Sequence, residues 1–308
     1  MGSLLIKFMR MLFSSASVTA RKDLSAALER DIKYERRCND LIEHILHDNT
    51  PGITGDHYAN QNIVVSLTSF GRRIDEVALT IESLMQQTRK ANRIVLWLPD
   101  DLERLPLPQA LVLQQRRGLE IKFCKDIRSY TKLIPQLKES PEDVIITVDD
   151  DLLYDYDVLD HLITAYLQNP KMIHCCRVHR MQFDSQGNLL PYNKWEWICS
   201  TEGTDKRYFL TGVGGVLYPP HCLDEEVFNE NIFMSICPEA DDIWFTAMAI
   251  KKGTPINKVF NRDKTEGDFI MNPHPLERGL SVRNVSMLGN DRQIQAVFSK
   301  YSLFDKIK

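Results

Sequence analysis

Val144-Ile145-Ile146-Thr147-Val148-Asp149-Asp150-Asp151 is a short apolar run that ends in three consecutive carboxylates. The run has the length and the β-branched composition of a buried strand. No basic residue is adjacent to the aspartates, so their charges repel one another unless a cation is present. A divalent metal that also binds diphosphate oxygens would relieve this repulsion. Because side chains alternate along a strand, we expect Asp149 and Asp151 to share one ligand cluster.

Three similar runs precede this one, at residues 62–67, 93–98 and 119–123, and segments with helical spacing separate them. A further helix is expected at about 129–138. Strands that alternate with helices predict a parallel, doubly wound α/β sheet. Ligands of such sheets bind beyond the carboxyl ends of the strands, where the strand order reverses. With the order 3-2-1-4, the turn at 66–71 lies opposite the three aspartates.

The ends of the chain differ from this central part. Residues 21–48 have the pattern of a charged helix, and Asn49-Thr50-Pro51-Gly52 breaks it. We therefore divide the chain into an N-terminal helical appendage (1–55), a catalytic domain (56–262) and a C-terminal tail or helix packed on that domain (263–308). Residues 4–13 fit either a short helix on a membrane surface or an ordinary docking helix. No apolar run is long enough to span a bilayer.

Composition excludes several classes of protein. The chain has 308 residues, with 38 basic and 42 acidic side chains and a net charge of −4. A nucleic-acid partner is not expected, because such proteins carry a basic excess. The seven cysteines are an odd number without CxxC spacing, which argues against a zinc ribbon or a disulfide framework. Free, mostly buried thiols in a reducing cytoplasm are expected.

The second half of the chain contains candidate substrate contacts. An acidic pair, Asp241-Asp242, begins a predicted helix, where carboxylates also complement the helix dipole without any catalytic role. The predicted strand at 211–220 carries Gly212, Gly214 and Gly215, which would allow either a close approach of a donor sugar or tight packing. Trp195 and Trp197 have the spacing of one strand face, and either acceptor stacking or core packing explains them.

Together these motifs resemble the nucleotide-sugar glycosyltransferases of the GT-A fold, and most closely the family 2 group that builds bacterial polysaccharides and lipopolysaccharides. The resemblance lies in the strand-plus-Asp-x-Asp, the opening 64–72, and the glycine-rich strand before the acidic pair; it covers about residues 60–262. It implies a Rossmann-like nucleotide-binding half and an acceptor-binding half in one continuous mixed sheet. It further implies a UDP-sugar or other nucleoside-diphosphate sugar, a glycan or lipid-linked acceptor, Mn²⁺ or Mg²⁺, and a cytoplasmic enzyme peripheral at most to the inner membrane.

The resemblance also implies roles for single residues. Asp151 and Asp149, with a late histidine (His274), would hold the metal, Asp149 also contacting the ribose. The nucleotide and donor sugar would be bound by Ser66, Thr68, Arg72, Asp126, Lys132, Asp149, Asp150, Gly214 and Gly215. Asp242 would be the base of an inverting transfer, with Asp241 orienting hydroxyls and Trp195 and Trp197 binding the acceptor. The family typically has Glu-Asp where this chain has Asp-Asp. A capped helix with a solvated lysine is the plain alternative for 126–132, and a surface-loop histidine is the alternative for His274.

Three other functions compete with this interpretation. An aspartate-dependent phosphotransferase or phosphatase also opens with an apolar strand and Asp-x-Asp, but that strand normally comes first in the chain, and Leu153 replaces the usual Thr or Val. A sugar nucleotidyltransferase needs a glycine-rich, arginine-containing loop that is absent from 67–73. A non-catalytic sugar-binding protein on the same fold is the third alternative.

Overall fold

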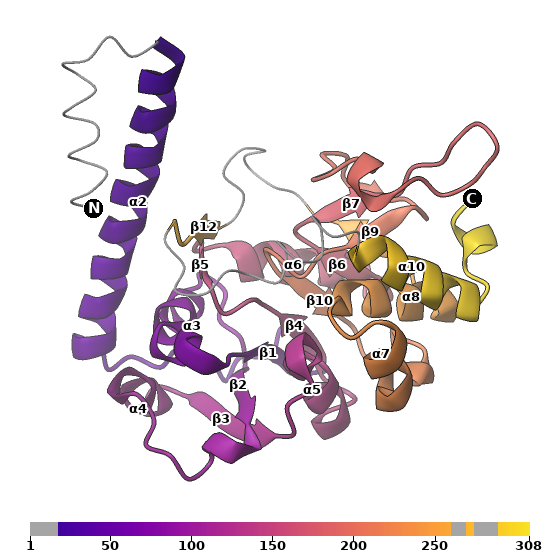
Figure 1. Ribbon diagram of the computed structural model, residues 1–308. Helices are drawn as coiled ribbons and strands as arrows, with labels where there is room; N and C mark the ends of the chain where they lie inside the picture. Colours follow the sequence, from indigo (N-terminus) through magenta and orange to yellow (C-terminus); the bar gives the residue numbers. More distant parts are fainter. Residues whose placement is uncertain (1–17, 260–268, 274–288) are drawn as a thin grey trace.

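The computed structural model describes residues 18–259, 269–273 and 289–308, which form a mixed α/β architecture (Figure 1). The helices are α2 (Val18–His47), α3 (Val77–Met85), α4 (Gln109–Gln115), α5 (Ile134–Glu139), α6 (Val158–Gln168), α7 (Glu230–Ile236), α8 (Asp241–Lys252) and α10 (Gly289–Lys300). The strands are β1 (Ile63–Thr68), β2 (Arg93–Pro99), β3 (Leu119–Cys124), β4 (Val144–Thr147), β5 (Leu152–Tyr154), β6 (Ile173–Cys175), β7 (Val178–Arg180), β8 (Gly203–Thr204), β9 (Tyr208–Leu210), β10 (Val216–Tyr218), β11 (Ile256–Lys258) and β12 (Phe269–Met271).

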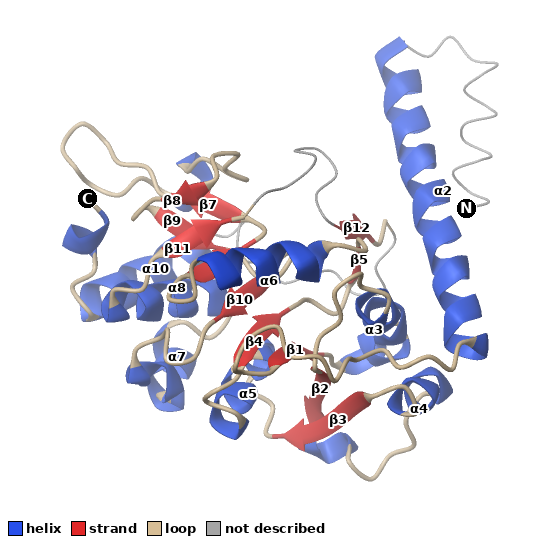
Figure 2. Cartoon of the chain, turned by 180° about the vertical axis from the view of Figure 1, so that it is seen from behind, coloured by secondary structure: helices blue, strands red, loops and turns tan. Residues whose placement is uncertain are grey.

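One eight-stranded sheet runs through the described part of the chain in the order β3-β2-β1-β4-β10-β6-β11-β8 (Figure 2). The first four strands are parallel, with Val65 of β1 opposite Ile94 of β2 and Ile146 of β4. β10 is antiparallel to both β4 and β6, and β11 is parallel to β6. The predicted order 3-2-1-4 and the single mixed sheet are therefore confirmed. Two small two-stranded sheets, β12-β5 and β7-β9, lie beside it.

Apolar side chains fill both faces of the sheet. One face packs on α3, α4 and α6 through a cluster that includes Val65, Ile94 and Leu162. The other face packs on α5 and α8 through Ile145, Tyr218 and their neighbours, and α10 packs against α8. Burial on both faces explains why β1, β2 and β4 are nearly continuous apolar runs, whereas β3, at the edge of the sheet, carries Glu120 and Lys122. Packing on both faces of the sheet therefore fixes the positions of the carboxyl ends of β1 and β4.

Two predicted elements are shorter in the structure. The helix expected at 129–138 is a 3₁₀ turn, η3 (Arg128–Lys132), followed by α5, because Pro135 is accommodated only in the first turn of a helix. The strand expected at 211–220 is reduced to β10. Gly214 and Gly215, with φ of +88° and +108°, form a turn before it that non-glycine residues rarely adopt.

The N-terminal helix α2 packs with its C-terminal half against α3 and α4, and its other half extends beyond the sheet (Figure 1). Cys38 and Leu41 of α2 contact Leu153 of β5. The seven cysteines are free thiols, and all except Cys124 are buried, as expected. Among the described residues, no helix combines the length and hydropathy needed to cross a bilayer. The segment 4–13 lies outside the described residues.

Candidate active site at the carboxyl ends of β1 and β4

The row of three aspartates lies where β4 has ended and the chain turns toward β5. Arg73, from the 3₁₀ turn η1 (Gly71–Asp75), donates to Asp150 Oδ1 at 2.8 Å and to Asp151 Oδ2 at 2.7 Å. Ser69 Oγ donates to Asp150 Oδ2 at 2.6 Å. Burial raises the pKa of Asp150 to about 6 and also raises that of Asp151, although Arg73 opposes both shifts. Arg73 thus supplies the cation that the row requires.

Asp149 has a different partner. Lys132 Nζ lies 2.9 Å from Asp149 Oδ1 and 3.2 Å from Asp241 Oδ2, so one buried ammonium joins the ends of β4 and α8. Burial alone would lower the pKa of Lys132, but the surrounding carboxylates raise it well above its usual value. Burial tends to raise the pKa of Asp149, but the charge and hydrogen bond of Lys132 lower it, and the net change is downward. The chain has left the strand conformation at the aspartates, and Asp149 and Asp151 pair with different cations, so a shared ligand cluster stays a prediction.

Asp242 lies in the first turn of α8, as the sequence predicts, and faces the same point. The backbone N–H of Gly212 donates to Asp242 Oδ1 at 3.0 Å. A Cβ atom at Gly212 would lie 2.8 Å from Lys132 Nζ, 3.3 Å from Asp242 Oδ1 and 3.5 Å from Asp149 Oδ1. The bare backbone of Gly212 therefore allows three charged groups to converge. Burial, followed by the charge of Asp241, raises the pKa of Asp242 to about 7.

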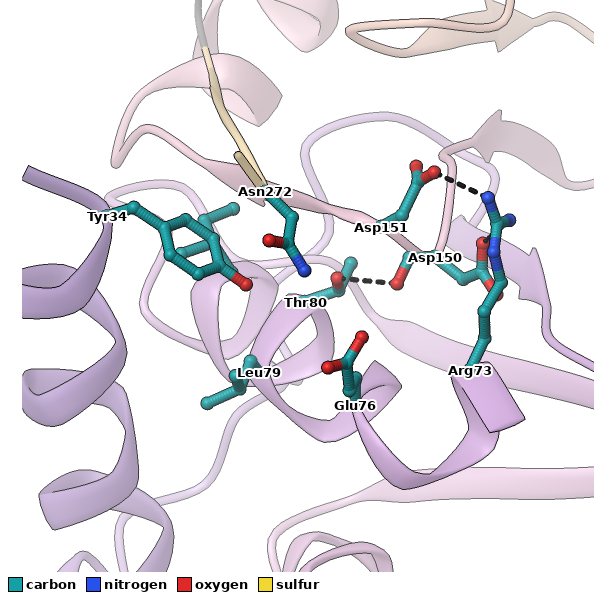
Figure 3. Close-up of a pocket in the computed structure, with 9 residues that line it drawn as sticks. Tyr34, Arg73, Glu76, Leu79, Thr80, Asp150, Asp151 and Asn272 are labelled. Atoms are coloured by element: carbon teal, nitrogen blue, oxygen red, sulfur yellow. Dashed lines mark hydrogen bonds and ion pairs between the residues drawn. The ribbon is translucent and has the colours of Figure 1, made fainter. Parts of the chain in front are cut away.

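A pocket opens on the other side of the row (Figure 3). Arg73, Asp150 and Asp151 line it together with Tyr34, Glu76, Leu79, Thr80, Leu153 and Asn272. The side chains of Tyr34, Glu76 and Asn272 point into the same space (Figure 3). The N-terminal helix, which lies outside the resemblance, therefore contributes a wall beside the aspartates through Tyr34.

Three residues predicted to line a nucleotide pocket either have other contacts or are exposed to solvent. Ser66 is fully buried, and its hydroxyl donates to the carbonyl of Lys132 at 2.6 Å, so it positions η3 instead of lining a pocket. The Thr68 hydroxyl donates to the carbonyl of Trp97 at 2.9 Å. Arg72 is exposed, and its neighbour Arg73 is the residue that pairs with the aspartates.

Asp126 is exposed and accepts a hydrogen bond at 2.7 Å from the backbone N–H of Arg128, which has a φ of +60°. This local turn explains Asp126, and no described contact joins it to the aspartate row. Lys132, from the same predicted segment, is buried within the charge cluster, so the solvated-lysine alternative is wrong.

The two predicted acceptor tryptophans separate in the structure. Trp195 is buried in the core and donates from Nε1 to the carbonyl of Leu190 at 2.8 Å. Trp197 is 42% exposed and stacks on His179 with ring centroids 5.1 Å apart. The bridge between Arg180 of β7 and Glu196 joins the segment that carries both tryptophans to β7. Core packing accounts for Trp195, while Trp197 keeps an accessible face.

The described carboxylates do not fit a divalent metal as they stand. Asp149 and Asp151 are each paired with a different cation, and the described residues contain no group of three or more His, Cys, Asp or Glu side chains placed to hold a metal. His274, the third predicted ligand, lies outside the described residues. Metal ligation by Asp149 and Asp151 would require release of Lys132 and Arg73.

Sequence reasoning missed Arg177 and named Gly212 only among possible close approaches. Arg177 follows β6 and donates from Nε to Thr211 Oγ1 at 2.9 Å. The positive charge of Arg177 acts to lower the pKa of Asp242 and of Asp149, and their negative charges act to raise the pKa of Arg177. Nothing in the sequence around Arg177 signals this position, because its contact Thr211 is 34 residues away and the other groups of the site lie on other elements.

No protein-family model matches the chain, and no curated protein sequence matches it. Solved structures do match. CMP:2-keto-3-deoxy-manno-octonic acid synthetase complexed with CTP is 13% identical over 65% of this chain and 89% of its own, with a TM-score of 0.37. Mannosyltransferase PcManGT from Pyrobaculum calidifontis, in complex with GDP-Man and Mn²⁺, is 14% identical over 49% of this chain and 44% of its own (TM-score 0.30). The inositol-1-phosphate CTP transferase from T. maritima is 11% identical over 81% and 97% (TM-score 0.43). Structural similarity this weak does not indicate a function for this chain.

Proposed function

We propose that this protein is a glycosyltransferase that moves a sugar from a nucleoside-diphosphate donor to an acceptor hydroxyl, with inversion, and that Asp242 is the base. One observation carries the proposal: the Asp242 carboxylate, held by Gly212, lies at the point where Lys132 and Asp149 meet beyond the carboxyl end of β4. Carboxyl ends near a reversal of strand order are where ligands bind in such sheets.

The proposed transfer requires a base that the acceptor hydroxyl can reach and whose pKa is close to neutral pH. Asp242 is partly exposed, and its pKa of about 7 leaves a large deprotonated fraction at neutral pH. It would accept the proton of the acceptor hydroxyl as that oxygen bonds to the anomeric carbon. The bond from the anomeric carbon to the phosphate oxygen breaks at the same time, and its electron pair leaves with the nucleoside diphosphate. A single displacement of this kind inverts the configuration.

The neighbouring charges have distinct tasks in this proposal. Asp241 is buried and paired with Lys132, so it positions that lysine and is not the base. Lys132 and Arg73 are fixed positive charges near the developing negative charge of the leaving group, the kind of preorganised stabilisation that contributes most to catalysis. Mn²⁺ or Mg²⁺ dependence comes from the resemblance, and no step above depends on it. A UDP-sugar donor and a glycan or lipid-linked acceptor of polysaccharide synthesis are the first candidates.

The proposal is tested by incubating the protein with a panel of UDP-, GDP- and dTDP-sugars, with and without Mn²⁺, and following nucleotide release. Parallel reactions with CTP or UTP and free sugars or sugar phosphates test a nucleotidyltransferase, and p-nitrophenyl phosphate tests a phosphatase. We expect release of a nucleoside diphosphate from one donor, with the opposite anomeric configuration in the product by NMR. Pyrophosphate release, phosphate release, or nucleotide binding without turnover would each favour one of the rival functions.

Matched variants test the assignment of the base. Asp242→Asn should lower kcat by roughly 10²- to 10⁴-fold, which is the usual contribution of a general base. Asp305→Asn, at an exposed position near the C-terminus, is the control and should leave kcat unchanged. An Asp242→Asn protein with full activity would remove Asp242 from the mechanism.

A further inference from the structure

Among the described residues, Arg177 has no carboxylate partner, unlike Lys132 and Arg73. Lys132 is paired with Asp149 and Asp241, and Arg73 with the other two aspartates of the row. Arg177 donates from Nε to Thr211, and within residues 18–259, 269–273 and 289–308 no carboxylate lies within ion-pair distance of it. A partly buried guanidinium without a partner loses hydration and gains little in return. An anion from outside the described chain would offset this loss.

The backbone holds Arg177 beside the proposed base. The Thr211 N–H and hydroxyl donate to the carbonyl of Arg177 at 3.3 and 3.1 Å, and the Arg177 Nε donates back to that hydroxyl. The next residue, Gly212, holds Asp242. Because Thr211 and Gly212 are consecutive residues, one short backbone segment contacts both the cation and the base.

The electrostatics of Arg177 agree with this geometry. Burial lowers the pKa of Arg177, and the charges of Asp242 and Asp149 oppose that change. Burial also raises the pKa of Tyr192, and its phenol is within electrostatic range of both Arg177 and Asp242. The Tyr192 ring contacts Trp197, which keeps an exposed face. Arg177 therefore belongs to the half of the site that holds the base and the accessible tryptophan.

We propose that Arg177 binds the carboxylate or phosphate of an anionic acceptor, and so presents a neighbouring hydroxyl of that acceptor to Asp242. This inference rests on the proposed function and narrows its acceptor to an acidic one. The donor side of the site already has Lys132 and Arg73 as its cations, which leaves Arg177 for the second substrate. A guanidinium suits this task because its planar fork matches the oxygens of carboxylates and phosphates.

The test uses pairs of probes that differ by one charge: methyl β-D-glucuronide against methyl β-D-glucoside, and glucose 6-phosphate against glucose, with UDP bound. Their dissociation constants are measured by calorimetry or NMR for the wild type, Arg177→Gln, Arg177→Lys and the control Arg207→Gln. Arg207 is a suitable control because it is paired with Asp205 in a half-exposed position. UDP affinity is measured for every variant.

We expect at least one acidic probe to bind the wild type about tenfold more tightly than its neutral partner, a ratio equivalent to about 1.4 kcal/mol. Arg177→Gln should lose this preference, Arg177→Lys should keep part of it, and UDP affinity should stay the same. The melting temperature of Arg177→Gln should fall only slightly, because the hydrogen bond to Thr211 is lost but no ion pair is broken.

Three results would overturn the inference: equal binding of acidic and neutral probes by the wild type, a preference that survives Arg177→Gln, or a loss of UDP affinity with an unchanged preference. The last would assign Arg177 to the donor diphosphate. These measurements need binding and not turnover, so they fail or succeed separately from the Asp242 experiment.

Discussion

Replacing Lys132 by methionine removes the ammonium that joins β4 to α8 and leaves its length and apolar stem. The Lys132 side chain is 9% exposed, and its partners Asp149 and Asp241 are 23% and 11% exposed. Removing one member of a buried ion pair costs about 3 to 5 kcal/mol, because the remaining charge is left without a partner. Whole domains are stable by about 5 to 15 kcal/mol, so the variant should fold but be markedly less stable.

The sign of the pH dependence follows from Asp149. In the wild type its pKa is lowered, so its contribution to stability is present above the unfolded value of about 3.9 and is lost as the pH falls through the lower folded pKa. Without Lys132, burial would raise that pKa and make the carboxylate destabilising as the pH rises. The difference between variant and wild type should therefore be largest near neutral pH and shrink toward pH 4.

Urea unfolding at about pH 7 and about pH 4.5 measures this difference. The matched control is Lys122→Met, since Lys122 also pairs with two carboxylates, Glu120 and Glu139, but at the surface. Its loss should cost about 0 to 1 kcal/mol at both pH values. Equal losses for the two variants, or a loss for Lys132→Met that does not depend on pH, would refute the reasoning.

Three further predictions concern the same site. kcat/KM should rise with pH and level off above an apparent pKa of about 7, because Asp242 must be deprotonated, and the Asp242→Asn protein should lack this rise. Arg73→Gln should bind Mn²⁺ more tightly than the wild type in calorimetric titrations without nucleotide, since it frees Asp150 and Asp151; an unchanged or weaker affinity would show that Arg73 does not compete with a cation. Ser66→Ala should lower the free energy of unfolding by about 1 kcal/mol through loss of one hydrogen bond and leave UDP affinity unchanged, whereas weaker UDP binding would return Ser66 to the nucleotide pocket.

The fold was accessible to sequence reasoning because its signals are local. Apolar runs of strand length alternate with helical spacing through residues 62–168, and this rhythm predicts a parallel sheet without knowledge of any contact. Strand and helix ends were less accessible. Pro135 shortened one helix, and the positive φ angles of Gly214 and Gly215 shortened one strand, since both depend on backbone geometry that hydropathy does not encode.

The same distinction between local sequence signals and long-range contacts applies to the site. The sequence by itself identified the acidic groups, because three aspartates after an apolar strand and an acidic pair at a helix start are visible as strings of residues. Which cation meets which carboxylate was decided only by the tertiary structure. Arg73 reaches Asp150 across 77 residues of sequence, and Gly212 reaches Asp242 across 30. Charge pairing depends on distances of a few ångströms between chain segments, and the packing of the sheet and its helices sets those distances.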